Sequence, residues 1–161
     1  MLDDNTDWRR EHLERRDVAR AQRDAILAYY AKAAGYEPGT ELPPEAYPEA
    51  YAGSYINTDG DLVVMVTEGC EAYLKTLREI TGNAVLLWEI ADYPYRELRA
   101  AWDMVHEALP SIMMDFKISA LILNEYENRL ELYMSDVTPA VERDFRRKVT
   151  DSGAVVLREN E

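Results

Sequence analysis

Few side chains in the sequence could act as a nucleophile, a general base or a soft metal ligand. There is one cysteine, Cys70, and there are two histidines, His12 and His106. A cysteine nucleophile needs a neighbouring base, and no histidine lies near Cys70 in the sequence. A zinc site of the usual spacing needs more cysteine and histidine, so we expect no metal site. We interpret Cys70 as a small core residue, His106 as a packed or surface histidine and His12 as a solvated one.

Carboxylates are abundant, but their spacing selects no reaction. The stretch from Asn57 to Asp61 alternates oxygen ligands like the start of a calcium loop, yet Gly69 falls near the position where such a loop needs a glutamate. We therefore expect a hairpin turn there. Glu125 and Glu127 are close in sequence, but chance pairs are expected among 31 acidic residues, and glycoside chemistry needs a cleft. The sequence therefore predicts a non-enzymatic protein without a cofactor.

Composition narrows the class of partner. The 161 residues form one domain or two small ones, and an apolar fraction of 47% allows a buried core. The formal net charge of −13 disfavours nucleic acid and anionic membranes and favours attraction to a basic protein. No apolar run is long enough to cross a bilayer. The opening Met1-Leu2-Asp3-Asp4 lacks the apolar part of a signal peptide. A single cysteine permits no internal disulfide, as in the cytosol and in many Gram-positive secreted proteins.

The first part of the chain is predicted to be a helix followed by a linker. From Thr6 to Ala34 there is no glycine or proline, and the second half of this segment is amphipathic with helical spacing. Gly35 is a plausible end of the helix. Five prolines and glycines then fall between residues 36 and 50, where neither a helix nor a central strand can run. We assign 1–35 to the N-terminal helix and 36–50 to a proline-rich linker.

The remainder is predicted to be mixed α and β, with an internal duplication. Residues 51–92 and 112–161 each show the order strand, turn, strand, helix, strand, and 93–111 form a linking helix. The first two strands of each unit are joined by a tight turn, so they must be antiparallel. The second strands match at an offset of 68, and the third strands, Ala84–Leu87 and Ala154–Leu157, at an offset of 70. The predicted fold class is therefore α+β, with an N-terminal helix and a duplicated ββαβ body.

The boundaries of the elements come from local signals. Pro94 is placed where a helix tolerates proline, and we expect Pro110 to end that helix. Thr138 and Pro139 are a typical start for the last helix. The predicted strands are Ala52–Asn57, Leu62–Thr67, Ala84–Ile90, Ile118–Leu123, Leu130–Met134 and Ala154–Leu157.

Two residue classes leave alternatives open. The eleven tyrosines are either a recognition surface, as tyrosine is at many interfaces, or ordinary half-buried packing. The basic residues near the end of the last predicted helix either complement the helix dipole or contact an acidic partner. These basic residues are Arg143, Arg146, Arg147 and Lys148.

A resemblance to a known family rests on three stretches. The first is Tyr47 to Thr67, with Pro48 and Tyr51 before a Gly53-Ser54-Tyr55-Ile56 strand, then Gly60 before Leu62-Val63-Val64-Met65-Val66-Thr67. The others are Tyr93 to Leu98 and Asp151 to Val156. Over residues 47–160 the chain resembles the pro-region domains that precede bacterial chymotrypsin-fold serine proteases, of the α-lytic protease and streptogrisin type. The N-terminal helix lies outside the clearest part of this resemblance.

The resemblance implies a protein-binding function. Such pro regions assist the folding of their protease and inhibit it, by extending a three-stranded sheet against the protease and placing their C-terminal tail in its active site. Here the second unit would supply the sheet. The implied protein-binding residues are Val155, Val156, Leu157, Arg158 and Glu159 at the edge, with Leu130, Leu132 and Tyr133 beside them.

One departure from the family keeps a second hypothesis open. The chain contains no Gly-Asp-Ser-Gly-Gly motif and no serine protease set of His, Asp and Ser. It is therefore either an N-terminal domain separated from its protease or a stand-alone interaction module that self-associates, as a homo-oligomer, through the N-terminal helix. We expect a secreted protein in the first case and a cytoplasmic one in the second.

Overall fold

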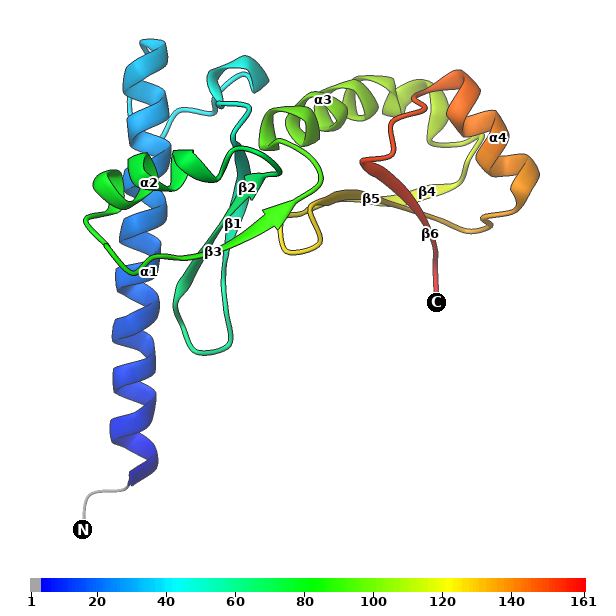
Figure 1. The fold of residues 1–161 in the computed structure, drawn as a ribbon. Helices are drawn as coiled ribbons and strands as arrows, with labels where there is room; N and C mark the ends of the chain where they lie inside the picture. The colour runs from blue at the N-terminus through cyan, green and yellow to red at the C-terminus, as the bar shows by residue number, and fades with distance from the viewer. Residues whose placement is uncertain (1–3) are drawn as a thin grey trace.

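A computed structural model describes residues 4–161, and Figure 1 shows the arrangement. A long helix, α1, runs along the first sheet, and α3 spans from the first unit to the second. The helices are α1 (Asp4–Ala34), α2 (Leu74–Thr81), α3 (Tyr95–Ile112) and α4 (Pro139–Lys148), with short 3-10 helices at Pro44–Ala46 and Glu71–Tyr73. The strands are β1 (Tyr51–Ile56), β2 (Leu62–Thr67), β3 (Leu87–Ala91), β4 (Ile118–Asn124), β5 (Arg129–Met134) and β6 (Val155–Glu159).

The predicted fold class is confirmed. Two three-stranded sheets have the orders β1-β2-β3 and β4-β5-β6. In each, the first two strands are antiparallel, as the tight turns require, and the third is parallel to the second. The parallel strand is reached through α2 in the first unit and α4 in the second. The molecule is thus an α+β protein with an N-terminal helix and a repeated ββαβ arrangement.

The strand registers show how closely the two units correspond. The first strand of each carries a bulge, between Tyr51 and Gly53 in β1 and between Ile118 and Ala120 in β4. The bulge in β1 lies opposite Val66 and Met65, and the bulge in β4 lies opposite Met134 and Tyr133. These residues of the second strands match at the predicted offset of 68. The predicted offset of 70 for the third strands is wrong.

The correction follows from the parallel ladders. Val63 lies opposite Leu87 in the first sheet, and its equivalent Glu131 lies opposite Val156 in the second. Leu87 therefore corresponds to Val156, whereas matching apolar letters in the sequence had paired it with Leu157. Backbone pairing, not side-chain similarity, sets the equivalence.

Most predicted element boundaries are confirmed, and the exceptions have local causes. The third strand begins at Leu87 instead of Ala84, because the Asn83 side chain accepts the Val85 N–H (3.0 Å) and holds that segment in a turn. Pro110 does not end α3, which runs to Ile112. A proline removes its own N–H bond and crowds the preceding turn, yet the helix continues, because the Met113 N–H still donates to the Leu109 carbonyl (2.9 Å).

The two units have separate cores. In the first, α1 and α2 pack on one face of the sheet; its largest fully buried side chains include Ile26, Tyr30, Tyr51, Val64, Val66 and Leu77. In the second, α3 and α4 cover β5, and its buried side chains include Val105, Leu130, Leu132, Met134, Phe145 and Val155. Each core buries one face of one sheet, as layered packing requires.

Most of the tyrosines belong to the packing alternative. Tyr30, Tyr47, Tyr51 and Tyr95 lie ring against ring between α1, the linker and α3. Burial raises the pKa of Tyr30 and of Tyr51 well above its ordinary value. Exposed rings are found at other positions, namely Tyr29, Tyr36 and Tyr126.

Polar contacts join the two units. Asn128, in the β4–β5 turn, accepts the Tyr93 N–H (2.7 Å) and donates to the carbonyls of Tyr93 (2.9 Å) and Ala52 (3.1 Å). Arg23 of α1 pairs with Glu125 of the same turn at 2.8 Å. Since α3 also packs against both sheets, the second unit is held in a fixed position relative to the first. No helix of residues 4–161 is long and apolar enough to cross a membrane.

Candidate functional site

The residues with nucleophilic or basic side chains lie apart from one another. Cys70 is half-buried and precedes the short helix Glu71–Tyr73. His12 stacks on Trp8 of α1, and His106 stacks on Trp102 of α3 at the surface. Within residues 4–161 no three His, Cys, Asp or Glu side chains come together as a metal site would need. These positions offer no constellation for nucleophilic catalysis.

The oxygen-rich loop is the predicted hairpin turn. The Asn57 side-chain oxygen accepts the N–H groups of Asp59 (3.1 Å) and Asp61 (2.9 Å), so the turn itself uses it. Gly60 has a φ of +88°, the left-handed conformation that glycine adopts without strain.

The acidic residues Glu125 and Glu127 do not form a catalytic pair. Glu127 is exposed, whereas Glu125 is largely buried beside Arg23. Burial raises the pKa of Glu125 above the ordinary carboxyl value, and the nearby Arg23 acts against this rise. The Glu125 carboxylate is therefore committed to the contact between the units.

The predicted protein-binding residues are brought together on two adjacent strands. Leu132 of β5 lies opposite Leu157 of β6, and Tyr133 lies opposite Arg158. Leu130 and Leu132, however, are fully buried, so they hold β5 in place and do not reach a partner. Val155 is buried as well. This leaves the later part of β6, with Tyr133 beside it, as the accessible part of the set.

The hydrogen bonds of β6 show which backbone groups face outward. The Leu130 N–H donates to the Ala154 carbonyl (2.8 Å), and the Asn160 N–H donates to the Met134 carbonyl (2.9 Å). The backbone N–H and carbonyl groups of successive residues alternate between the two sides of a strand, so those of every second residue of β6 point toward β5. The residues whose backbone N–H and carbonyl groups point away from β5 are Val155, Leu157 and Glu159.

Only part of this outward edge is open. The Val155 carbonyl accepts from the Arg146 guanidinium (2.7 Å), and the Val155 N–H donates to the Ser152 carbonyl (3.2 Å). Among the described residues, no segment bonds the outward backbone groups of Leu157 and Glu159. Arg146 thus closes the start of β6 by bonding carbonyls beyond the end of α4, which is neither of the two alternatives given for the basic cluster.

Charged side chains surround the open part of β6. Arg158 lies 3.5 Å from Glu131, and the Glu159 side chain accepts the Val137 N–H (3.1 Å). Tyr133 donates to Glu131 (3.0 Å), and this bond raises the pKa of the Tyr133 hydroxyl. Polar side chains of this kind commonly protect a sheet edge from indiscriminate pairing.

Sequence reasoning missed a second open edge, on β3. Three of its apolar side chains are well exposed, with fractions of 45% for Leu87, 42% for Trp88 and 52% for Ile90. The sequence predicts a strand here, but an apolar run of this kind does not show whether the strand lies at an edge. Had Leu87 been matched with Val156, the equivalence of β3 with the edge strand β6 would have indicated that β3 is also an edge strand.

The ladder of the first sheet leaves the β3 edge open at two residues. The Thr67 N–H donates to the Ala50 carbonyl (3.1 Å), so Thr67 and every second residue before it face β1. Val64 and Val66 therefore face β3. Because Val64 lies opposite Trp88 and Val66 opposite Ile90, the outward backbone groups are those of Trp88 and Ile90.

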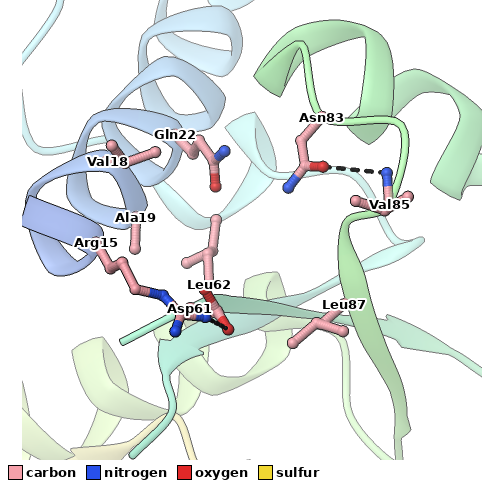
Figure 2. A pocket seen from close by; sticks show the side chains of 9 residues that line it. All are labelled: Arg15, Val18, Ala19, Gln22, Asp61, Leu62, Asn83, Val85 and Leu87. Carbon is pink, nitrogen blue, oxygen red and sulfur yellow. Dashed lines mark hydrogen bonds and ion pairs between the residues drawn. The ribbon is translucent and has the colours of Figure 1, made fainter. Parts of the chain in front are cut away.

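A pocket of about 480 Å³ lies at the start of this edge. Figure 2 shows it between α1, the start of β2 and the segment leading into β3. At its rim, Arg15 pairs with Asp61 at 2.7 Å. Its apolar wall consists of Val18, Ala19, Leu62, Val85 and Leu87.

Comparison with known families finds a match for the first half of the chain. Residues 9–87 match the family described as a Pro-like N-terminal domain. The match includes most of α1, although we expected the resemblance to begin at residue 47; the buried face of α1 builds the first core, so the helix is an integral part of this unit. The second unit lies outside the match, and no curated protein matches the chain. Pro-region-like domains are generally non-catalytic. Over residues 9–87, then, the chain is similar to the Pro-like N-terminal domain family, which supports a pro-region-like domain in this part of the molecule.

Proposed function

We propose that this protein is a non-catalytic, protein-binding pro-region domain that assists the folding of a secreted chymotrypsin-fold serine protease and inhibits it. The binding step is extension of the second sheet: a strand of the protease pairs with the outer edge of β6. The observation that carries the proposal is the open backbone of Leu157 and Glu159 at the edge of a rigid three-stranded sheet.

Pairing at β6 would supply both affinity and orientation. Each outward N–H and carbonyl can bond a partner strand, and the parallel β5–β6 pair already fixes the direction of the edge. Half-buried Leu157 packs against the second core, which limits the motion of the edge before binding. Arg146 stops the pairing at Val155, so a partner strand can pair only with the part of β6 from Leu157 onward.

The test uses α-lytic protease as the probe. We measure recovery of activity after the denatured protease is diluted with this chain, and inhibition of the folded protease by it. Leu157→Pro is the informative variant, because the Leu157 N–H points away from β5 and its loss leaves the β5–β6 bonds intact. We expect inhibition to weaken about tenfold, as for loss of one buried hydrogen bond with its strand contact.

A matched control lies on the opposite edge of the same sheet. Leu121 of β4 is likewise a half-buried leucine of the second core. It lies opposite Leu132, whose backbone faces β6, so the Leu121 N–H also points out of the sheet. Leu121→Pro should leave inhibition unchanged. Failure of the native chain to inhibit or refold the protease, or equal effects of both prolines, would contradict the proposal.

Self-association through α1 is the second candidate. The charged first half of α1 exposes the large apolar side chains of Trp8 and Leu13, with Val18 at its end. Deleting residues 1–40 is a poor test, because Ile26 and Tyr30 belong to the first core. Trp8→Glu with Leu13→Glu keeps that core. If a dimer forms in sedimentation experiments, this variant should be monomeric; an unchanged dimer would exclude α1 as the interface.

A further inference from the structure

The two sheets present equivalent edges with different chemistry. Under the backbone correspondence, Trp88 and Ile90 are the counterparts of Leu157 and Glu159, and these are the outward-facing residues in both units. Glu89 of β3 is the counterpart of Arg158 of β6. The outward-facing residues of β3 are thus both apolar, with the Glu89 carboxylate between them. In β6 the second outward-facing residue, Glu159, is charged.

We infer that the β3 edge is a second strand-docking site, and that it takes an extended segment of another protein whose side chains are apolar on one face and basic on the other. The site lies on a different sheet from the edge proposed to bind a protease, so the inference does not depend on that function. Long apolar edges left uncovered are unusual in soluble proteins, because they pair with other chains.

The alternation of β3 sets the apolar face of the partner. Side chains directly opposite in a parallel ladder share a face, so Trp88 and Ile90 lie on the face of Val64 and Val66 that the helices cover. A strand docked beside β3 would place its apolar side chains next to Trp88 and Ile90. At the start of the edge, one of them would enter the pocket of Figure 2, between Val18 and Val85.

Glu89 sets the charge of the partner on the other face. Its carboxylate accepts a hydrogen bond from Tyr55 (2.7 Å), and no cationic side chain among residues 4–161 pairs with it. Two arginines that contact the first unit are already paired, Arg15 with Asp61 and Arg129 with Asp92. A lysine or arginine of the docked strand would therefore complement Glu89.

Charge also argues against a second copy of this chain as the occupant. Each copy carries a formal net charge of −13, so two copies repel one another. A two-fold pairing of β3 with itself centred on Glu89 would place two carboxylates directly opposite each other, which is unfavourable. A basic partner avoids both costs.

The experiment uses two capped octapeptides as probes, one alternating valine and lysine and one alternating valine and glutamate. Amide chemical shifts of the whole chain are followed during titration to about 1 mM peptide. We expect the lysine peptide to shift the amides of Trp88 and Ile90, with an affinity that falls as salt is added. Glu89→Lys should weaken this binding about fivefold, as for a surface charge pair, and should favour the glutamate peptide.

The control reverses a charge elsewhere by the same amount. Glu79 is exposed on α2 and belongs neither to β3 nor to the lining of the pocket beside it, so Glu79→Lys should bind the lysine peptide as the native chain does. Ile90→Pro, which removes an outward N–H, should abolish the shifts at β3 while protease inhibition is retained. Absence of shifts at Trp88 and Ile90, equal binding of both peptides, or a dimer that Ile90→Pro dissociates would overturn the inference.

Discussion

At the scale of single residues, the most consequential polar group is a carboxylate that no reaction uses. Glu125 is largely buried between the two units, and Arg23 is its cationic partner at 2.8 Å. Burial raises the pKa of Glu125, so the folded chain binds more protons than the unfolded chain between the ordinary carboxyl pKa and the raised one. The free energy of unfolding therefore falls as the pH rises through that window.

Replacing Arg23 should widen this effect. Arg23→Gln removes the cation that opposes the rise, so the pKa of Glu125 rises further and the window extends upward. Since Arg23 is partly exposed, we expect the free energy of unfolding to fall by about 2 kcal/mol at neutral pH, and this loss should largely disappear once the pH drops below the raised pKa of Glu125. Urea unfolding at several pH values measures it.

The matched control is another arginine of the same helix. Arg20 pairs with Asp17 at the surface of α1, with both side chains exposed. Arg20→Gln should change stability by less than about 0.5 kcal/mol at every pH, because solvent screens exposed pairs. If Arg23→Gln lowered the free energy of unfolding equally at every pH, packing of the arginine, not the Glu125 charge, would be responsible.

At the scale of elements, the start of α4 is a second test of local physics. The Thr138 hydroxyl accepts the Val141 N–H (3.2 Å), and Pro139 occupies the first helical turn. Thr138→Ala should cost about 1 kcal/mol in urea unfolding, whereas Thr138→Ser should keep most of the stability. Equal losses in the two variants would mean that the threonine methyl, not its hydroxyl, matters at this position.

Elements with strong local signals could be predicted from the sequence. α1 ends just before Gly35 and β2 spans Leu62–Thr67 as expected, because glycine and a β-branched run are local determinants. The end of α3 could not be predicted, since burial of Ile112 in the second core outweighs the single bond that Pro110 removes. Tertiary packing decides such cases.

The candidate site could be predicted only in part, for the same reason. The sequence placed β6 in the correct sheet, but not the burial of Leu130 and Leu132, which depends on where α3 and α4 lie. The exposed edge of β3 was not predicted at all. An apolar strand is the same in sequence whether or not a neighbour covers it, so edge position requires the sheet order.

At the scale of the whole molecule, Asn128 is the main polar link between the units. It is only 4% exposed, makes three hydrogen bonds across the junction and has a φ of +55°. Asn128→Ala should cost about 3 kcal/mol in urea unfolding, because it leaves buried backbone groups of Tyr93 and Ala52 unpaired and strains the backbone.

A glycine at this position separates the two causes. Asn128→Gly loses the same hydrogen bonds but adopts a positive φ without strain, so it should be about 1 kcal/mol more stable than Asn128→Ala. If both variants were as stable as the native chain, the other contacts between the units, such as α3 and the Arg23–Glu125 and Arg129–Asp92 pairs, would suffice to hold them together.

Extension of the second sheet at β6 by a partner protease, as we propose, can be tested by hydrogen exchange of individual amides. The Leu157 and Glu159 N–H groups point out of the free sheet, so they should exchange quickly in the isolated chain. With folded α-lytic protease bound, we expect strong slowing at these two amides and little change along β4. Binding without slowing at Leu157 and Glu159, or slowing confined to β3 or α1, would contradict it.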